Sequence, residues 1–408
     1  MGRNFRQTRA LSNRFLGRAV AIRNGFPVHL GFLPKPAAER FDCDTQSPYS
    51  LGNRFLKGAL IRKKATTIYD IARQAQVSVS TVSRVLNGNS AVNAELRTRV
   101  EAAMHDLRFR PNRIAQTLFH HRSHTLGCVL PDIVSPFFAQ LFLELEVGAF
   151  ERGYTIILGN TVSTPALERT YLQTLAERQV DGLLYLGGLT NALEVAPEDL
   201  ALLRDLAERL PIVTVNGDLP EVGIVTSVRS DEAGGMRALL SHLRACGHTE
   251  VAFLGGKTDV TSTAEKLQVY HELCPGHPPE WVQPTGLDID SGVQALGNLL
   301  GAARRPTAVA CINDLVAAGV LLAARTHGLN VPGDLSVTGF DDVFPSRITA
   351  PPLTTVNHNY AELARLALDA LLLGIEGQPA PRTVTVPTLL VGRDSVAPHK
   401  GDTGPNLN

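Results

Sequence analysis

Residues 67–88, TIYDIARQAQVSVSTVSRVLNG, have the pattern of two short amphipathic helices joined by a tight turn. The first helix is predicted from Thr67, because Thr67 and Asp70 have capping-box spacing. Its apolar stripe repeats at i, i+3, i+4 and i+7, at Ile68, Ile71, Ala72 and Ala75.

The second helix follows a turn at residues 76–78, with Ser78 as its expected N-cap. Three of its side chains, Val82, Val85 and Leu86, are predicted to be buried. The opposite face should turn outward Val79, Ser80, Thr81, Ser83 and Arg84. Asn87-Gly88 is the expected end of this helix.

A third amphipathic segment begins at an expected cap, Asn93, and carries on one face Leu96, Val100, Ala103, Met104 and Leu107. Three small helices with a shared core predict a helix-turn-helix headpiece over residues 65–110. Its second helix would present small polar residues and one Arg to base edges in the major groove. Helical periodicity alone is equally compatible with a generic three-helix bundle that has a solvated face.

The string itself closely resembles the DNA-binding headpiece of the LacI/GalR family of bacterial transcription regulators. The resemblance implies that Val79, Ser80 and Arg84 read the operator, with Arg84 paired to a guanine. The full set of DNA contacts expected from it comprises Thr67, Tyr69, Ser78, Val79, Ser80, Thr81, Ser83, Arg84, Asn87, Asn112, Arg113, Ala115 and Leu118.

From residue 125 onward, apolar strands alternate with helical stretches. Strands are predicted at 125–130, 155–158, 182–186, 212–215, 251–254, 308–311 and 335–338. Such alternation indicates parallel sheets covered by helices, with ligands bound at the carboxyl ends of the strands. The length of this α/β region suggests two subdomains.

This region also resembles the LacI/GalR family, in TLGCVLPDIVSPFFAQL, HLRACGHTEVAFLGG, PTAVACINDLVAAGVLLAARTHGLNVPGDLSVTGFDD and the terminal GRDS. The match runs from about residue 66 to residue 395. It implies a periplasmic-binding-protein-like body of two Rossmann-like lobes over 125–395, with a small effector, a sugar or related metabolite, between them. A polar tail over 396–408 has no leucine heptads, so a tetramerisation helix is not expected there.

The connector over 111–124 begins with PNRIAQTL, from the string RPNRIAQTL at residues 110–118. A helix in this segment would be too short to be stable in isolation. The resemblance implies a hinge helix that folds on DNA and inserts Leu118 into the minor groove. The alternative is a plain linker with a buried leucine.

Effector contacts are inferred from the same resemblance. Asp314, in IND after a strand end, matches a ligand-contacting acid of the family, although an Asp there can also cap the following helix. Phe137, Phe138 and Asp132 match positions lining the pocket from the first lobe, although the two phenylalanines could be core residues.

Three positions depart from the family pattern, so the effector could differ from a common sugar. Lys266 stands where the family has a gripping Arg and lacks its bidentate fork. Leu287 replaces a stacking aromatic, and Asn216-Gly217 replaces an Asp-Arg pair. Secondary candidates for the same cleft are Asp288, Asp231 and Arg229.

The formal net charge of zero conceals an asymmetry. Residues 1–64 have 13 Lys and Arg against 3 Asp and Glu, residues 65–113 have 7 against 4, and the remainder has 19 against 32. Positive charge therefore belongs to the end expected to meet phosphates. Three interpretations of residues 1–64 stay open: a start site assigned too far upstream, a disordered basic arm, or an organellar transit peptide, which the bacterial resemblance argues against.

Other function classes have little support in the sequence. There is no GxGxxG after a strand, no GxxxxGK[ST] and no nucleophile elbow, so no catalytic residue, cofactor or metal ligand set is expected. No run of about 18 apolar residues predicts a membrane span. Five scattered cysteines fit a reduced cytoplasmic compartment. A periplasmic transport receptor would need a secretory signal and no headpiece. The sequence thus predicts a transcriptional regulator, most simply a repressor, acting as a homodimer on a near-palindromic operator.

Overall fold

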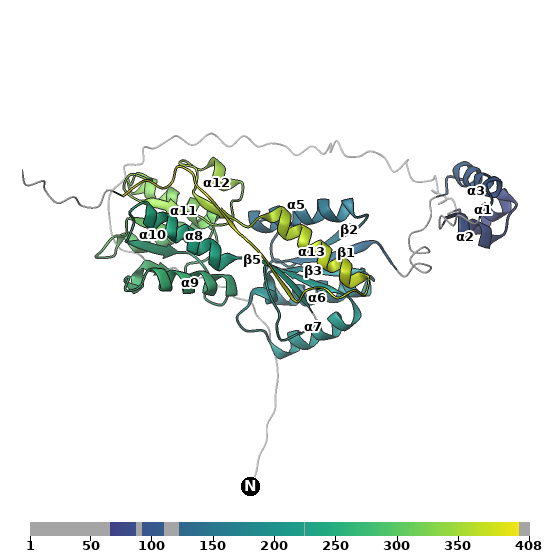
Figure 1. Ribbon diagram of the computed structural model, residues 1–408, viewed down its shortest axis with the longest axis horizontal. Coiled ribbons are helices and arrows are strands. Elements are labelled where there is room, and N and C mark those ends of the chain that lie inside the picture. The colour runs from purple at the N-terminus through teal and green to yellow at the C-terminus, as the bar shows by residue number, and fades with distance from the viewer. Residues whose placement is uncertain (1–65, 87–91, 110–121, 224, 400–408) are drawn as a thin grey trace, which may run out of the picture. The chain divides into compact units, whose positions relative to one another are not determined.

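The computed structural model describes residues 66–86, 92–109, 122–223 and 225–399 (Figure 1). The first two ranges form a headpiece of three helices, α1 (Ile68–Ala75), α2 (Val79–Leu86) and α3 (Ala94–Asp106). Their shared core consists of Ile71, Ala72, Ala75, Val82, Val85, Val100 and Ala103. The predicted three-helix headpiece is confirmed.

The caps of these helices explain where they begin. Thr67 donates from its backbone N–H and its hydroxyl to Oδ2 of Asp70, at 2.9 and 2.7 Å. Ser78 Oγ accepts the N–H of Thr81 at 3.1 Å, and Asn93 Oδ1 accepts the N–H of Glu95 at 2.9 Å. All three helix starts therefore lie where short polar side chains bond backbone groups that have no intrahelical partner.

The first lobe of the body is a six-stranded parallel sheet in the order β11-β5-β4-β3-β1-β2. Its elements are β1 (Thr125–Leu130), α5 (Pro136–Glu151), β2 (Thr155–Asn160), α6 (Pro165–Glu177), β3 (Gly182–Leu186), η1 (Gly188–Asn191), α7 (Pro197–Arg209), β4 (Ile212–Val215), β5 (Thr226–Ser230), α13 (Tyr360–Ile375) and β11 (Thr383–Val386). Helices α5 and α13 cover one face of the sheet, while α6 and α7 cover the other (Figure 1).

The second lobe has a four-stranded parallel sheet in the order β7-β6-β8-β9. Its elements are α8 (Glu232–Ala245), β6 (Val251–Leu254), α9 (Thr261–Leu273), η2 (Pro279–Trp281), β7 (Val282–Gln283), α10 (Ile289–Leu300), β8 (Ala308–Cys311), α11 (Asp314–Thr326), β9 (Ser336–Thr338), α12 (Pro345–Ile348), β10 (Thr355–Asn357) and β12 (Leu389–Val391). Helices α10 and α11 approach so closely that a Cβ on Gly292 would lie 2.1 Å from the carbonyl oxygen of Val316. Glycine is therefore required at that contact.

Three chain segments connect the two lobes. The chain passes from β5 to α8, returns from β10 to α13, and passes again from β11 to β12. Strands β10 and β12 pair antiparallel beside the second lobe, as Thr355 pairs with Val391. Because each lobe is completed by segments from distant parts of the chain, neither is a continuous piece of sequence.

The predicted strands agree well with this architecture. Those predicted at 125–130, 182–186, 212–215, 251–254 and 308–311 are observed with the same bounds, and the others differ at one end only. Sequence patterns did not indicate five short strands, β5, β7, β10, β11 and β12. The predicted hinge helix, and with it Asn112, Arg113, Ala115 and Leu118, lies outside the described residues, as do Asn87 and the start of the chain.

Candidate functional site

Helix α2 presents a polar surface next to the headpiece core. Ser80 and Arg84 are exposed, and Thr81 and Ser83 are half-buried on the same helix. Ser78 Oγ lies 2.7 Å from Ser80 Oγ and 2.8 Å from Thr81 Oγ1, so these hydroxyls form a linked group at the start of the helix. A helix N-terminus rich in hydroxyls, followed by an exposed guanidinium, can contact phosphates and guanine edges of duplex DNA.

Two further predicted DNA contacts have different environments. Tyr69 on α1 is 65% exposed, so its ring is available to a partner. Val79 is half-buried and packs against the headpiece core, and is therefore only partly outward. Its predicted apolar contact with a base would use only the part of the side chain that stays exposed.

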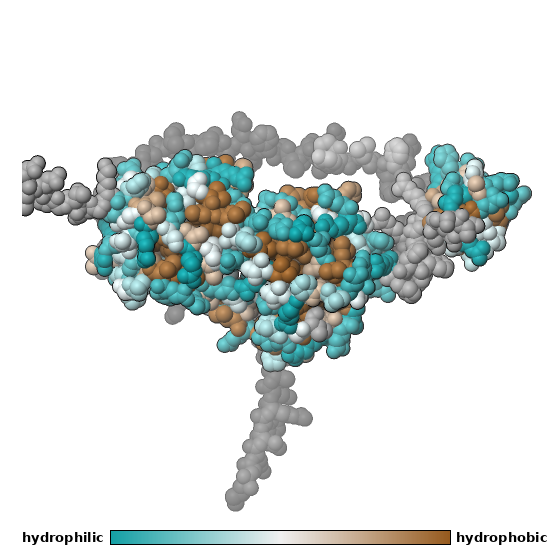
Figure 2. Space-filling view, in the orientation of Figure 1, coloured by the Kyte–Doolittle hydropathy of each residue, from teal (hydrophilic) through white to brown (hydrophobic). Residues whose placement is uncertain are grey.

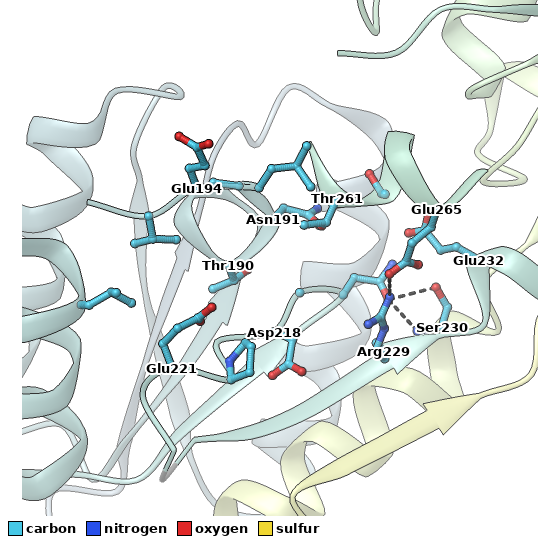
Figure 3. Close-up of a pocket in the computed structure, with 18 residues that line it drawn as sticks. Thr190, Asn191, Glu194, Asp218, Glu221, Arg229, Ser230, Glu232, Thr261 and Glu265 are labelled. Carbon is cyan, nitrogen blue, oxygen red and sulfur yellow. Dashed lines mark hydrogen bonds and ion pairs between the residues drawn. The ribbon is translucent and has the colours of Figure 1, made fainter. Parts of the chain in front are cut away.

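A pocket of about 630 Å³ lies at the carboxyl ends of β3, β4 and β5 (Figure 3). The first lobe supplies most of its wall, and α8 and α9 of the second lobe complete it. It is lined by Thr190, Asn191, Ala192, Leu193, Glu194, Val195, Leu200, Asn216, Gly217, Asp218, Pro220, Glu221, Arg229, Ser230, Glu232, Thr261, Ser262 and Glu265. Its position agrees with the rule that open parallel sheets bind ligands beyond the carboxyl ends of their strands.

Direct contacts between the lobes border this pocket. Arg229 on β5 forms an ion pair with Glu265 on α9 (Figure 3). Thr261 Oγ1 donates to Asn191 Oδ1 at 2.6 Å, and the N–H of Leu193 donates to the carbonyl of Asp259 at 3.0 Å. A molecule in the pocket would therefore touch groups whose positions depend on how the lobes are held together.

Lys266 has a buried acidic partner. Its Nζ lies 2.7 Å from Oε2 of Glu232 and 3.9 Å from the centre of the Phe340 ring. Burial of Glu232 opposes its ionisation, yet Lys266, His358 and Arg229 together hold the pKa of Glu232 below its ordinary value. Lys266 is 4% exposed and does not line the pocket. Its charge instead compensates the charge of Glu232, and Glu232 does line the pocket.

A second polar network crosses from the first lobe toward β10. Ser230 Oγ lies 2.7 Å from Nδ1 of His358, and Nε2 of His358 lies 2.9 Å from Oδ1 of Asp341. Asn216 Oδ1 accepts the N–H of Ser230 at 2.7 Å. Asn216 and Ser230 thereby connect the pocket wall to a histidine that is 1% exposed.

Asp314, the predicted effector contact, has hydrogen-bond partners within the second lobe. Its side chain is fully buried, and its two carboxylate oxygens accept hydrogen bonds from Thr355 Oγ1 at 2.6 Å and from the N–H of Val343 at 2.9 Å. Burial, reinforced by the nearby Asp341, raises the pKa of Asp314 well above its usual range. Asp314 does not line the pocket, and the helix it begins is capped by Asn313 instead.

Other residues proposed for the pocket also lie outside its lining. Phe137 stacks edge-on against His358, with ring centres 4.9 Å apart, and Phe138 packs on the first-lobe core. Asp132 Oδ1 accepts the N–H of Val134 at 3.0 Å. Leu287 is half-buried against the core of the second lobe.

The secondary candidates separate into two groups. Asp288 and Asp231 are N-caps of α10 and α8, and accept the N–H groups of Ser291 and Gly234, each at 2.8 Å. Their side chains therefore serve helix starts. Arg229 does line the pocket.

Sequence motifs did not indicate any of the five carboxylates of the pocket: Glu194, Asp218, Glu221, Glu232 and Glu265. Asp218 and Glu221 lie in NGDLPE, directly after the predicted strand at 212–215, and that position could have identified them. Glu265 lies within a helix beside Lys266, and no local pattern distinguishes it from an ordinary surface acid.

Among the described residues, no group of three or more His, Cys, Asp or Glu side chains could hold a metal ion. Burial raises the pKa of the Cys128 and Cys311 thiols, which are therefore unreactive. No helix in the described ranges has the length and apolar character needed to cross a membrane.

Exposed apolar side chains occur on both lobes. On the first lobe, Leu143, Val147 and Phe150 of α5 are 51%, 50% and 77% exposed. On the second, Phe344 beside α12 and Ile348 within it are 68% and 66% exposed. Figure 2 shows apolar surface at both places, beside α5 and α12. Apolar surface of this kind marks interaction sites.

Two family descriptions match the chain. Residues 67–112 match "Bacterial regulatory proteins, lacI family", and residues 240–396 match "Periplasmic binding protein-like domain". The first match covers the headpiece and the second covers most of the second lobe.

Curated relatives match over nearly their whole length. The HTH-type transcriptional regulator DegA of Bacillus subtilis is 31% identical over 339 residues, which are 82% of this chain and 98% of DegA. The ribose operon repressor of Haemophilus influenzae is 32% identical over 335 residues, 81% of this chain and 98% of that repressor. The HTH-type transcriptional repressor PurR of Escherichia coli is 30% identical over 336 residues, 81% of this chain and 97% of PurR.

Solved structures give the same result. The lac repressor dimer bound to operator and the anti-inducer ONPF has a TM-score of 0.74 at 28% identity, covering 82% of this chain and all of the repressor chain. The complex of the transcriptional regulator CelR with cellobiose has a TM-score of 0.60 at 30% identity, covering 81% of this chain and 99% of CelR.

Proposed function

Because this chain belongs to the LacI family of bacterial regulatory proteins, we propose that it represses transcription by binding operator DNA under the control of a small molecule. The observation that carries this proposal is the surface of α2, where Ser80 and Arg84 are exposed beside a compact three-helix core. In a helix-turn-helix, the second helix enters the major groove with its N-terminal residues at the base edges.

Within this proposal the headpiece residues divide into two roles. Arg84 reads a guanine with its forked donors, and Ser80 offers a hydroxyl to an adjacent base. Thr67, Tyr69, Ser78 and Thr81 contact the sugar-phosphate backbone and fix the orientation of the helix. Asn87, Asn112, Arg113, Ala115 and Leu118, which lie outside the described residues, are proposed to extend the interface, with Leu118 in the minor groove.

The proposed active form is a homodimer. The exposed apolar side chains of α5 and α12 supply a surface that a second copy can cover. The lac repressor structure similar to this chain is a dimer bound to operator. A two-fold dimer requires an inverted-repeat operator, because each headpiece reads one half-site.

The pocket at the carboxyl ends of β3, β4 and β5 is the proposed effector site. Because both lobes line it, a ligand that binds one arrangement of the lobes more tightly shifts the protein toward that arrangement. We propose that this shift in the arrangement of the lobes changes the affinity of the protein for operator DNA, and that this coupling is the regulation. This action is binding rather than catalysis, and it takes place in the cytoplasm, where the DNA is.

The test is transcription in vitro from a template on which the full chain gives a DNase footprint. The expected result is a lower yield of the transcript whose promoter overlaps the footprint, with no change for a promoter on a template without the site. An increased yield would make the protein an activator, and failure to footprint any site would refute sequence-specific DNA binding.

A further inference from the structure

The charged lining of the effector pocket is strongly unbalanced. Its carboxylates are Glu194, Asp218, Glu221, Glu232 and Glu265. The described part of the lining offers one cation against them, Arg229. From these observations we infer that the effector is an organic cation of the di- or polyamine class, an inference that rests on the proposed function of this pocket.

Part of this acidity is already neutralised within the protein. Glu265 is paired with Arg229, and Glu232 is paired with Lys266 at 2.7 Å. Glu232 is 7% exposed, and its Oε2 is the oxygen that Lys266 Nζ contacts. The uncompensated negative charge of the pocket therefore belongs to Glu194, Asp218 and Glu221.

The other three carboxylates, Glu194, Asp218 and Glu221, have no ion-pair partner in the described ranges. Asp218 is half-buried and its Oδ1 accepts the N–H of Leu219 at 2.8 Å. Glu221 and Glu194 line the pocket nearer the solvent, and Figure 3 shows the Glu221 carboxylate turned toward Thr190. A ligand that covers these carboxylates removes water from them, which is costly unless the ligand brings positive charge.

The charge pattern also selects against other ligand classes. Phosphorylated sugars and carboxylic acids would be repelled, because a cleft lined by one sign of charge concentrates the opposite sign. A neutral sugar can donate hydroxyls to carboxylates but leaves their charge uncompensated. A bare metal ion is too small for about 630 Å³, and the described residues contain no metal-binding group of side chains.

The uncharged lining suits a chain of methylene groups between ammonium groups. Ala192, Leu193, Val195 and Leu200 supply an apolar wall. Asn191 and Thr261 supply hydrogen-bonding groups at the boundary between the lobes. Ammonium groups near Asp218 and Glu221, with methylenes against the apolar wall, would satisfy both surfaces at once.

The test is calorimetric titration of the full chain, without DNA, with putrescine, spermidine, glucose and glucose 6-phosphate. DNA is left out because polyamines bind its phosphates. We expect the amines to bind and the two sugars not to bind, and amine binding should weaken as salt is raised. Binding of either sugar without binding of an amine would overturn the inference, as would binding of none of the four.

The decisive variant is Asp218→Asn/Glu221→Gln, and its matched control is Glu177→Gln/Glu208→Gln, which removes two exposed carboxylates from α6 and α7. Spermidine affinity should fall at least tenfold in the pocket variant and by less than about twofold in the control. Glu194→Gln provides a second pocket variant, at a position outside the hydrophobic core. Equal losses in pocket and control variants would mean that amines bind the acidic surface in general, which would overturn the inference.

Operator binding by the same protein preparations separates the two proposals. If the protein binds operator but no amine, the proposed function stands and the inference that the effector is an amine is refuted. If the protein binds amines but no DNA, the proposed function itself is refuted.

Discussion

Arg229 of the first lobe and Glu265 of the second form an ion pair at the wall of the pocket. Their side chains are 30% and 32% exposed, so water screens the pair and its contribution to stability is small. Its importance lies in its position, because it joins β5 to α9 beside the place where a ligand would bind. The ion pair therefore favours the observed arrangement of the two lobes over arrangements in which Arg229 and Glu265 are apart.

Glu265→Ala should change the free energy of unfolding by less than about 1 kcal/mol, as for other exposed pairs. It should nevertheless speed hydrogen exchange at the backbone N–H of Leu193, which donates to Asp259 across the lobes. Glu272→Ala is the control, since it breaks the exposed Arg237–Glu272 pair within the second lobe. Faster exchange at Leu193 in both variants would show that the effect is not specific to the inter-lobe pair.

Asp314→Ala should destabilise the protein by roughly 2–3 kcal/mol, because the buried N–H of Val343 and the hydroxyl of Thr355 lose their acceptor. Asp314→Asn should cost less than about 1 kcal/mol, since the amide oxygen can accept the N–H of Val343 and the Thr355 hydroxyl can turn to accept the amide N–H. Urea denaturation measures both. An unchanged stability in the Ala variant would contradict a structural role for Asp314.

Glu168→Gln should alter the dependence of stability on pH. Burial of Glu168 raises its pKa, although hydrogen bonds from Tyr185 and from the N–H of Leu189 to the same oxygen oppose the shift. The folded state holds the proton of Glu168 more tightly than the unfolded state does. The protonated side chain therefore contributes its full share to the free energy of unfolding below the ordinary pKa of about 4.3. This contribution is lost as the pH rises from the ordinary pKa through the raised pKa of Glu168 in the folded protein.

The Gln variant keeps an oxygen for both donors and cannot ionise. Its stability relative to the native protein should therefore increase as pH rises through that interval, as measured by urea denaturation from about pH 4 to about pH 8. Glu177→Gln on the same helix, at an exposed position, is the control and should show no such trend. A parallel pH profile for Glu168→Gln and the native protein would contradict the buried-acid account.

Local patterns were enough to predict the headpiece and the central strands. The caps at Ser78 and Asn93 and the apolar run at 125–130 depend on residues close in sequence. Strand β7 could not be predicted in this way, because it has only two residues, Val282 and Gln283, and is completed by pairing with β6, where Val282 lies opposite Phe253. A strand held by a partner so distant in sequence has little local signal.

The pocket was harder to predict for the same reason. Asp314 stands in a recognisable motif, but its role depends on Thr355 and Val343, which come from segments far along the chain and fill its acceptor sites. Arg229 was identified as a candidate, while its partner Glu265 was not, because only the fold brings β5 and α9 together. The three-dimensional arrangement decides which acids face solvent, core or cleft.

Deleting residues 1–64 should leave operator specificity intact and reduce the salt dependence of DNA binding. The deleted segment has 13 Lys and Arg against 3 Asp and Glu, and the plot of log affinity against log salt becomes less steep as fewer cationic side chains meet phosphates. Fluorescence anisotropy on specific and random duplexes at several salt concentrations measures both quantities. Loss of discrimination between the duplexes after deletion would make this segment part of the specific interface.

The proposal that a dimer reads DNA through α2 is tested most directly by in vitro selection of binding sites from random duplex DNA. The native chain should enrich an inverted repeat with a guanine in each half-site. Arg84→Ala should bind that sequence about 1–3 kcal/mol more weakly for each half-site and lose the preference at one base pair. Arg73→Ala, which removes a side chain that is 82% exposed on α1, should keep the preference. Enrichment of a sequence without two-fold symmetry, or the same base preference in Arg84→Ala and the native protein, would contradict recognition by α2 in a dimer.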